Sequence, residues 1–415
     1  MDLTTGKTLW TMTYSNPPTY PELSQDEECD VAVLGAGEAG AICSWYLSKA
    51  GFHCMVVDKR QVGRGSTQAN TGLVQFMNDM PLHKLIEIHG REKAVRFYRL
   101  CQQAVSDLSD LVLQIPYPTE YAAKDSLYFA SSSKYVKCLE EEYRCLIAEK
   151  FPVEFLSRVE IETRFPFSKP AALWTGGDAQ INPYRLTHSI FQHLESRGTR
   201  IFENTEIVNL KIERGSPVLY SSQGHRIRCK YVIFASGYET EERWQTSGTK
   251  LQTTYTIATE PVTDFSGWLN RCLIWETKRP YLYLRTTADN RILVGGLDEN
   301  TIRNPERDKV LLEKVTQLKS NLGQLFPEYT QIGVACQWSG VFATSKDGMP
   351  FIGRHPQLQN CFYALGYGGN GTVYYTMAGK ILTQLLMDGS HPDEDLFDAR
   401  RFQLLYQLAE KIGLH

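Results

Sequence analysis

The chain has 415 residues, of which 42% are hydrophobic and 22% are charged, so it has the composition of an ordinary globular protein with room for two or three domains. Its formal net charge of −3, without a basic tail or a block of one sign, gives no reason to expect nucleic acid or an anionic membrane as a partner. The ten cysteines are scattered and no apolar run reaches the length of a membrane span, so we expect a cytoplasmic protein with reduced thiols, no metal site and no membrane span.

The first regular unit of the chain follows an arm. Residues 1–28 contain the proline-bearing stretch NPPTYPEL and are expected to form an irregular arm on the surface. After it, VAVL predicts a strand and AICSWYLSKAG predicts a helix. Between them lies GAGEAG, with Gly35, Gly37 and Gly40 at the spacing of a dinucleotide-binding fingerprint.

Each glycine of this turn has a separate purpose. Gly35 permits the tight turn out of the strand, Gly37 lets the backbone approach a pyrophosphate, and Gly40 lets the helix pack closely on the strand. The next strand, CMVVD, ends in Asp58, where an acidic side chain accepts hydrogen bonds from a ribose hydroxyl. The pattern therefore predicts a bound dinucleotide.

Residues within the fingerprint and after the second strand bear on which dinucleotide binds. Glu38 lies in the first helical turn, and because its charge would repel a pyrophosphate we expect its side chain to point to solvent. Lys59 and Arg60 follow the acid of the second strand and could meet a 2′-phosphate. The fingerprint by itself thus leaves NAD, NADP and FAD open.

The middle of the chain alternates between helical and strand patterns. A polar loop, GRGSTQANTG, precedes one long predicted helix from Leu82 to Ile115, which Pro116 ends. The stretch WTGGDAQ predicts a turn, and a helix begins near Asn182-Pro183. KYVIFASG predicts a buried strand that ends in small residues, residues 250–300 predict strands with a hairpin turn at Ala288-Asp289-Asn290, and residues 305–325 predict a helix.

The end of the chain repeats the opening arrangement. CFYAL predicts a strand, GYGGNG a second glycine-rich turn, and TVYYTMAGKILTQLL a helix. Together with the first fingerprint and with DGMPFIG, this segment resembles the D-amino-acid oxidase superfamily of FAD enzymes, which includes glycine, sarcosine and γ-glutamylputrescine oxidases. INPYRLTHSI, TEIVNL, YVIFASG, IATEP, YLRTTADNRILVGG, W-S-G and GYGGNG follow in the family's order, and the arm with CDVAVLGAGEAG is most similar to the γ-glutamylputrescine oxidase branch.

The resemblance implies the architecture. It implies an α/β fold in which a Rossmann-like FAD-binding domain is interleaved with an α+β substrate domain built on an antiparallel sheet. After the arm at 1–28, the FAD-binding domain is expected at 29–115, 173–243 and 338–415, and the substrate domain at 116–172 and 244–337.

The resemblance also implies the site residues. FAD is expected to contact the first glycine turn, the acid after the second strand, the GRGSTQANTG loop, the end of the KYVIFASG strand and the C-terminal turn: Gly35, Ala36, Gly37, Glu38, Ala39, Gly40, Asp58, Lys59, Arg60, Gly65, Ser66, Thr67, Ala69, Asn70, Thr71, Gly72, Ile207, Ala235, Ser236, Gly237, Trp338, Gly340, Gly366, Tyr367, Gly368, Gly369, Asn370, Gly371 and Thr372. The candidate catalytic residues are Tyr283, Arg285 and Tyr367.

The activity implied is oxidation of the C–N bond of a small amine or amino acid derivative to an imine, by hydride transfer to flavin N5, with oxygen as acceptor and hydrogen peroxide as product. The alternative is an FAD-dependent dehydrogenase of a hydroxy acid or N-methyl amine that uses another acceptor. From a different class, an NADP-binding sensor or scaffold would rest on Arg60 alone.

Several positions depart from the family's pattern. The arginine with which glycine oxidases clamp a carboxylate is replaced by Phe342, and the corresponding lysine of sarcosine oxidases by Val373. Both changes favour an amine whose carboxylate is distant or absent. Leu293 stands where sarcosine oxidases have a lysine for oxygen activation, which leaves oxidase and dehydrogenase open.

Other residues are candidates for the pocket. Arg285 or Arg291 could anchor the substrate instead of the missing clamp, although each is more often a solvated strand residue. Cys336 falls near the position at which sarcosine oxidases attach FAD, but an ordinary buried thiol is the preferred interpretation. Aromatic residues that could enclose an amine chain are Tyr255, Tyr281, Tyr283, Trp338, Tyr367, Tyr374 and Tyr375.

Overall fold

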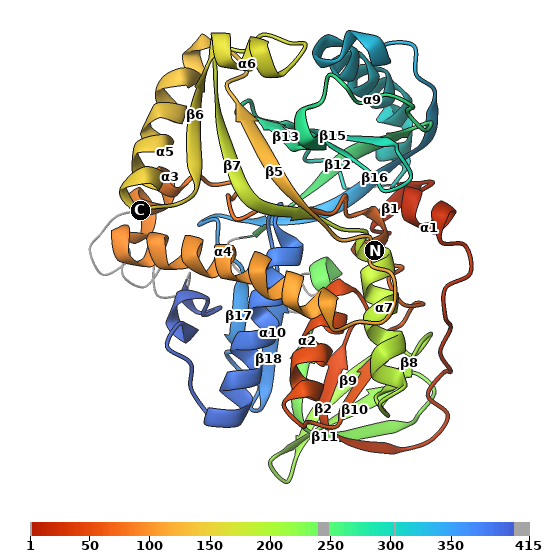
Figure 1. The fold of residues 1–415 in the computed structure, drawn as a ribbon. Coiled ribbons are helices and arrows are strands. Elements are labelled where there is room, and N and C mark those ends of the chain that lie inside the picture. Colours follow the sequence, from red (N-terminus) through yellow and green to blue (C-terminus); the bar gives the residue numbers. More distant parts are fainter. Residues whose placement is uncertain (1, 240–248, 303, 402–415) are drawn as a thin grey trace.

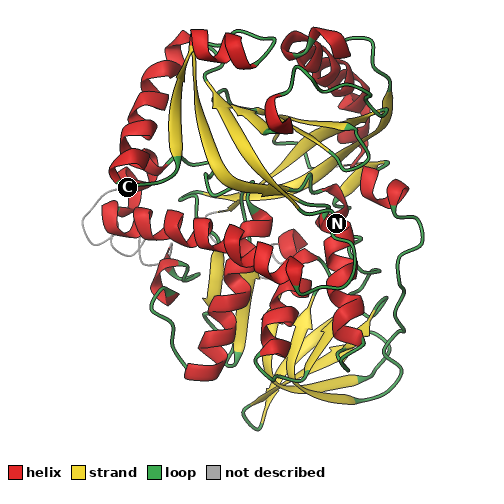
Figure 2. Cartoon of the chain, viewed as in Figure 1, coloured by secondary structure: helices red, strands yellow, loops and turns green. Residues whose placement is uncertain are grey.

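The computed structural model describes residues 2–239, 249–302 and 304–401, which form two β-sheets with helices packed beside them (Figure 1). A ten-stranded sheet lies in the upper half of the view and an eight-stranded sheet in the lower half. The long helix α4 (Arg91–Leu113) runs across the middle, between the two halves. Figure 2 shows strands in both halves, so each half has its own sheet.

The eight-stranded sheet has the parallel core of a Rossmann-like domain. β2 pairs in parallel with β3 on one side and with β11 on the other, β18 and β8 continue the parallel set outward, and only β17 joins antiparallel to β18 at that edge. Strands covered on both faces read as continuous apolar runs, which is why VAVL and CMVV were recognisable in the sequence. The order is β17 (Phe351–Arg354), β18 (Cys361–Leu365), β11 (Arg226–Phe234), β2 (Glu27–Leu34), β3 (Cys54–Val57) and β8 (Arg200–Phe202), with β10 (Ser216–Ser221) and β9 (Ile207–Glu213) extending from β11.

The ten-stranded sheet is antiparallel except where β13 pairs in parallel with β5. Its longest register joins β12 to β16. The order is β1 (Thr4–Gly6), β16 (Val334–Ser345), β12 (Thr249–Thr259), β15 (Ile292–Glu299), β14 (Leu282–Thr286), β13 (Leu273–Glu276), β5 (Ala122–Phe129), β7 (Ala171–Gln180) and β4 (Leu73–Val74), with β6 (Val153–Ser157) beside β7. The predicted hairpin between β14 and β15 is confirmed, and Asn290 takes a positive φ of 61° in its turn.

The helices bury apolar faces against the two sheets. Leu318 and Leu322 of α9 pack with Ile257 of β12 in the core of the ten-stranded half, while α10 packs against α2 and α4 in the other half. The remaining helices are α1 (Leu9–Thr13), α2 (Glu38–Lys49), α3 (Leu82–His89), α5 (Val136–Ala148), α6 (Arg158–Arg164), α7 (Pro183–Glu195), α9 (Asn304–Leu325) and α10 (Gly371–Asp388). The helix predicted near Asn182 begins there because the Asn182 side chain accepts a hydrogen bond from the Arg185 N–H.

Three of the sequence-based expectations are wrong. The arm is not irregular throughout, because it contributes β1 to the ten-stranded sheet and the helix α1, whose Leu9 and Trp10 are buried. The long helix expected from residue 82 to 115 is two helices, because Gly90 between them has a φ of 80° that no α-helix accepts. The stretch WTGGDAQ belongs to β7 and is not a turn.

Two expected domain boundaries fall inside strands of the ten-stranded sheet. The boundary at 172/173 divides β7 and the boundary at 337/338 divides β16. Since a strand is held by its neighbours along its whole length, neither position can separate two domains. We propose that the segments change sheets after β7 and after β16 instead.

Candidate active site

The first glycine turn connects β2 to α2 with almost no free space around it. A Cβ on Gly35, which has a φ of 120°, would lie 2.4 Å from the Ala235 carbonyl oxygen, and a Cβ on Gly40 would lie 1.9 Å from the Gly35 oxygen. Gly37 is the N-cap of α2 and makes no side-chain capping bond. Only glycine fits these two crowded positions, so the helix N-terminus comes close to the ends of β2 and β11.

The acid after β3 is tied to this turn. Asp58 accepts hydrogen bonds from the Ala36 N–H at 2.7 Å and from the Arg60 N–H at 2.8 Å, and burial raises the pKa of its carboxyl group. Arg60 donates to both oxygens of Glu239 at 2.8 and 2.7 Å, and Lys59 lies 3.1 Å from the same carboxylate. The two cations considered for a 2′-phosphate therefore already share an internal acid.

Glu38 does not point to solvent, and that expectation is wrong. Its side chain is 2% exposed and accepts hydrogen bonds from Asn70 Nδ2 at 2.9 Å and from Thr372 Oγ1 at 2.7 Å. Burial raises the pKa of Glu38 to about 7, and the two hydrogen bonds partly oppose that rise. The carboxyl group thus joins the first glycine turn, the GRGSTQANTG loop and the start of α10.

The GRGSTQANTG loop is held by two buried indoles. Trp10 Nε1 donates to the Asn70 carbonyl at 2.7 Å, and Trp338 Nε1 donates to the Ala69 carbonyl at 3.0 Å. The Asn70 side chain accepts from the Gly72 N–H at 2.9 Å. The N-terminal helix and β16 therefore fix the backbone of a loop that lies between them.

Hydrogen bonds to other segments also fix the C-terminal glycine turn. The Gly368 N–H donates to the Ala343 carbonyl at 2.8 Å, and the Gly369 N–H donates to Asp79 Oδ2 at 2.7 Å. Asn370 Nδ2 donates to the Met77 carbonyl at 2.7 Å. Because the Asn370 side chain bonds to the segment that follows β4, the C-terminal glycine turn is held between the two sheets.

Both glycine turns line one cavity of about 530 Å³. The cavity extends from the ends of β2, β3 and β11 to the faces of β12, β13 and β14. The predicted residues that line it are Gly35, Gly37, Glu38, Ala39, Asp58, Lys59, Arg60, Gly65, Ser66, Thr67, Ala69, Asn70, Thr71, Ile207, Ala235, Ser236, Gly237, Tyr283, Gly340, Gly368, Gly369, Asn370 and Gly371. Residues more than 300 positions apart in the chain thus share a single cleft.

Some predicted site residues support the cavity from behind its wall. Gly40 and Gly72 allow close backbone packing, since a Cβ on Gly72 would lie 2.1 Å from the Ile181 oxygen. Thr372 and Trp338 act through the hydrogen bonds given above. The predicted residues outside the lining are Ala36, Gly40, Gly72, Arg285, Trp338, Gly366, Tyr367 and Thr372.

Of the three candidate catalytic residues, only Tyr283 lines the cavity. Arg285 is buried and donates to the carbonyls of Thr71 at 2.5 Å and Ile181 at 2.8 Å, with its guanidinium over the Trp10 ring. Tyr367 is 1% exposed and packs in the apolar core against Tyr238. Neither Arg285 nor Tyr367 lines the cavity, so the contacts seen in the structure give both side chains a structural role and their catalytic role stays a prediction.

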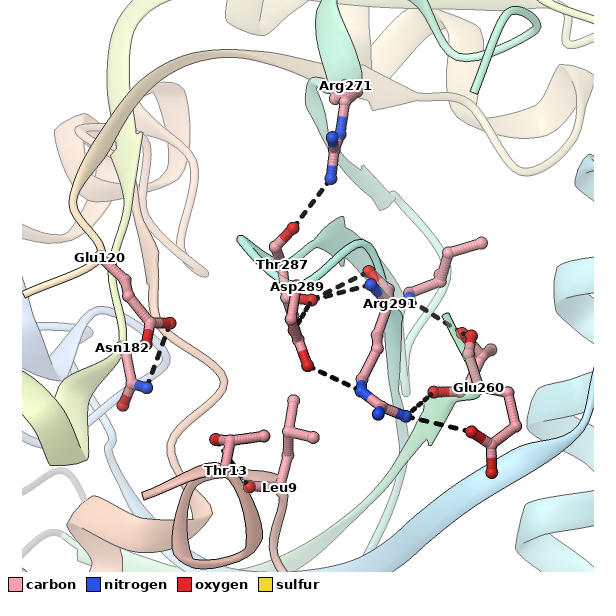
Figure 3. Close-up of polar contacts among 11 residues, drawn as sticks. Leu9, Thr13, Glu120, Asn182, Glu260, Arg271, Thr287, Asp289 and Arg291 are labelled. Carbon is pink, nitrogen blue, oxygen red and sulfur yellow. Dashed lines mark hydrogen bonds and ion pairs between the residues drawn. The ribbon is translucent and has the colours of Figure 1, made fainter. Parts of the chain in front are cut away.

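Arg291, the other candidate substrate anchor, also lies outside the cavity lining. Figure 3 shows it at the β14–β15 hairpin, where it lies 2.8 Å from Asp289 and 3.4 Å from Glu260. In the same view Arg271 donates to the Thr287 carbonyl at 2.8 Å. These cations stabilise the hairpin outside the cavity.

The positions that depart from the family's pattern have different surroundings. Phe342 lines the cavity where a clamping arginine was expected, whereas Val373 is buried in a core. Leu293 and Cys336 lie together in an apolar cluster with Trp10, outside the cavity. Burial raises the pKa of the Cys336 thiol to about 11, which fits the interpretation of an ordinary buried thiol.

The aromatic residues divide between the cavity and the cores. Tyr281, Tyr283 and Tyr375 line the cavity. The other four, Tyr255, Trp338, Tyr367 and Tyr374, are buried in apolar clusters. Spacing in the sequence did not separate the two groups.

Sequence reasoning missed an acidic and aromatic end of the cavity. Trp275 of β13, Asp298 of β15 and Asp79 after β4 line it together with Tyr281. Trp275 follows two other buried residues of β13, and Asp298 lies in the half-buried end of β15, so neither strand shows an alternation that marks these residues. Nothing local in the sequence places Asp79 near the C-terminal turn.

In the described part of the chain, no group of three or more His, Cys, Asp or Glu side chains could hold a metal ion. None of the described helices is long and apolar enough to cross a membrane. All ten cysteines are free thiols.

Comparisons with known proteins agree with this geometry. Residues 30–385 match the model of the family described as FAD dependent oxidoreductase. Glycine oxidase from Geobacillus kaustophilus has a solved structure that superimposes with a TM-score of 0.78 at 20% identity, over 90% of this chain and 99% of that one. The predicted fold class is confirmed by this likeness.

Two curated relatives align along most of the chain. YhfW of Bacillus subtilis (strain 168), which is named as a Rieske 2Fe-2S iron-sulfur protein, is 24% identical over 96% of this chain and 76% of its own length. γ-Glutamylputrescine oxidoreductase of Escherichia coli (strain K12) is 23% identical over 92% of this chain and 88% of its own.

Proposed function

The chain belongs to the family of FAD-dependent oxidoreductases, and on that premise we propose that it oxidises the C–N bond of a small amine. The observation that carries the proposal is the single cavity lined by both glycine turns, with an aromatic and acidic end opposite the dinucleotide end. A relative named γ-glutamylputrescine oxidoreductase supports an amine as the substrate class.

The residues of the cleft fit FAD. The turn at Gly35 and Gly40 leaves no space for a Cβ, as expected where a backbone has to approach a pyrophosphate and a helix N-terminus faces it. We place the pyrophosphate at Gly37, the adenosine ribose at Asp58 and the adenine beside Ile207, all of which line the cavity. The two glycine-rich loops at 65–72 and 366–372 would hold the isoalloxazine.

When bound, FAD accepts a hydride at N5 from the carbon next to the substrate nitrogen. The amine thereby loses two electrons and two protons and becomes an imine, which adds water and releases ammonia. The residues of this chain have to hold the amine in place and exclude water, because the redox chemistry belongs to the cofactor. Tyr283 and Tyr281 line the cavity where they can do both.

The cavity favours an amine over an α-amino acid. Among the described residues, Lys59 and Arg60 are the only lysine or arginine in its lining, and both contact Glu239 at the dinucleotide end. A carboxylate next to the oxidised carbon would have no cation to bind, and Phe342 occupies the position of the clamp. Leaving a charged carboxylate unpaired in such a site is costly.

The electron acceptor has two candidates. We propose oxygen, which would take the two electrons and two protons and leave as hydrogen peroxide. Two observations support the alternative, a non-oxygen acceptor: Leu293 is buried in an apolar cluster at the position where sarcosine oxidases have a lysine, and one relative is named as an iron-sulfur protein.

Anaerobic reduction tests the proposal. The purified protein is expected to show a flavin spectrum that bleaches on addition of a primary amine from a panel of alkylamines, diamines and α-amino acids. A protein without flavin, or one bleached by hydroxy acids and not by amines, would refute it. Admission of air then separates the acceptors, because an oxidase yields one peroxide per amine and a dehydrogenase requires an added acceptor.

A further inference from the structure

The end of the cavity between β13, β14 and β15 has the chemistry of a cation site. The aromatic side chains of Trp275, Tyr281 and Tyr283 line it together with the acidic side chains of Asp79 and Asp298. The Trp275 and Tyr281 rings lie 6.3 Å apart edge to face, and the Tyr281 and Tyr283 rings lie 5.7 Å apart. Aromatic faces and carboxylates together attract ammonium groups.

Two buried atoms of this site, Trp275 Nε1 and Asp298 Oδ1, have no hydrogen-bond partner among the described residues. Asp298 Oδ1 is buried and accepts no hydrogen bond from any residue that the structure describes. Buried polar atoms in native proteins are almost always bonded, so an orphaned carboxylate oxygen on a cavity wall points to a group that arrives with the ligand. Burial raises the pKa of Asp298 to about 7, and the Thr254 hydroxyl favours its ionised form.

The other charged residues near this end of the cavity are already bonded, so Asp298 is the carboxylate that can bind a cationic group of a ligand. Asp79 already accepts the Gly369 N–H, which is part of the C-terminal turn. Arg279 donates to the Asp79 carbonyl oxygen at 2.8 Å, with its guanidinium 4.6 Å from the centre of the Tyr281 ring, and it does not line the cavity. No described lysine, arginine or histidine enters the lining at this end.

We propose that Asp298 binds an ammonium group of the substrate other than the nitrogen that is oxidised. This inference rests on the proposed function. Hydride transfer requires a neutral amine at the reacting carbon, and a buried carboxylate holds the nitrogen beside it in its charged form. The two requirements conflict at one nitrogen and are both met by a substrate with two. The substrate class is therefore an aliphatic diamine or a derivative that carries a second cationic centre.

The test compares α,ω-diamines of three to six carbons with n-alkylamines of the same lengths, on holoenzyme and on the isosteric variant Asp298→Asn. Anaerobic stopped-flow reduction gives the apparent Kd of each amine separately from the limiting rate of flavin bleaching, and the thermal shift of the holoenzyme by each amine gives a second measure of binding. Asp308→Asn, the same change on the exposed face of α9, is the control.

We expect the best diamine to bind wild-type enzyme more tightly than its matched monoamine. Asp298→Asn should raise the Kd of that diamine on the order of 10- to 100-fold, because a charge-assisted bond is lost, and should leave the monoamine and the limiting rate nearly unchanged. Equal affinities for diamine and monoamine in the wild type would overturn the proposal. The proposal would also be overturned if Asp298→Asn raised the Kd of the diamine and of the monoamine equally, or if it lowered the limiting rate of flavin bleaching and shifted its pH profile. In either case Asp298 would act at the oxidised nitrogen. If amines bleach the flavin but diamines have no advantage, the amine oxidation stands and this inference fails.

Discussion

The closest backbone contact at the first glycine turn gives the sharpest prediction. In Gly40→Ala the new Cβ would lie 1.9 Å from the Gly35 oxygen, and real Cβ contacts are essentially never below 3.0 Å. The helix and the turn must therefore separate by about 1.1 Å, the difference between these two distances. Hydrogen bonds span only about 2.7–3.2 Å, so a displacement of this size removes at least one N–H bond to a bound phosphate.

The expected effects follow from that displacement. Losing one hydrogen bond to a charged acceptor costs about 1.5–3 kcal/mol, which weakens FAD binding about 10- to 100-fold. Forcing a methyl group into packed backbone costs a further 1–3 kcal/mol, roughly, of folding stability. Titration of apoprotein with FAD measures the first effect, and thermal unfolding of the apoprotein measures the second.

Gly176→Ala is the matched control for this variant. Gly176 lies in β7, and the nearest atom to its Cβ would be an Asp125 side-chain oxygen at the ordinary distance of 3.5 Å. The control should bind FAD like the wild type. If Gly40→Ala also binds FAD with unchanged affinity, the reasoning that places the pyrophosphate on this turn is wrong.

Three further predictions concern buried groups. Glu38 has a pKa raised from 4.5 to about 7, so the folded state binds the proton more tightly and the stability that it contributes is lost as pH rises from about 4.5 through 7. Glu38→Gln should therefore gain in Tm relative to the wild type as pH is raised from 5 to 8, and a pH-independent difference would contradict this. Arg285→Lys should lower Tm, because each buried carbonyl left without its donor costs about 1–3 kcal/mol; a raised KM with unchanged Tm would instead restore the substrate-anchor role. Acid precipitation should release the flavin into the supernatant, because Cys336 lies outside the cavity, and colour in the pellet would show a covalent link.

The elements near the two glycine turns were predictable because their signals are local. A continuous apolar run, a glycine where the backbone is crowded and an apolar helix are all properties of residues close in the sequence. The same holds for Asn182 at the start of α7 and for the hairpin at Asn290. These are the parts of the fold that the sequence analysis placed correctly.

Local signals also explain the errors. Hydrophobic periodicity continues across Gly90, and the backbone conformation that breaks the helix there leaves no trace in that pattern. Gly176 and Gly177 suggested a turn, yet β7 continues past them because Thr175 and Asp178 on either side pair with Ser126 and Lys124 of β5. The register shift between these two pairs absorbs the irregularity.

The sequence by itself determined the dinucleotide turn, the family and the cofactor, since these depend on short motifs and on their order along the chain. Only the tertiary structure decided which polar residues work in the cleft. Glu38 is buried because its partner Thr372 lies 334 positions away, Arg285 is occupied by carbonyls from two other segments, and Asp298 faces the cavity. Burial and hydrogen bonding of a charged side chain depend on atoms brought together by folding, so residue type and spacing could not assign these roles.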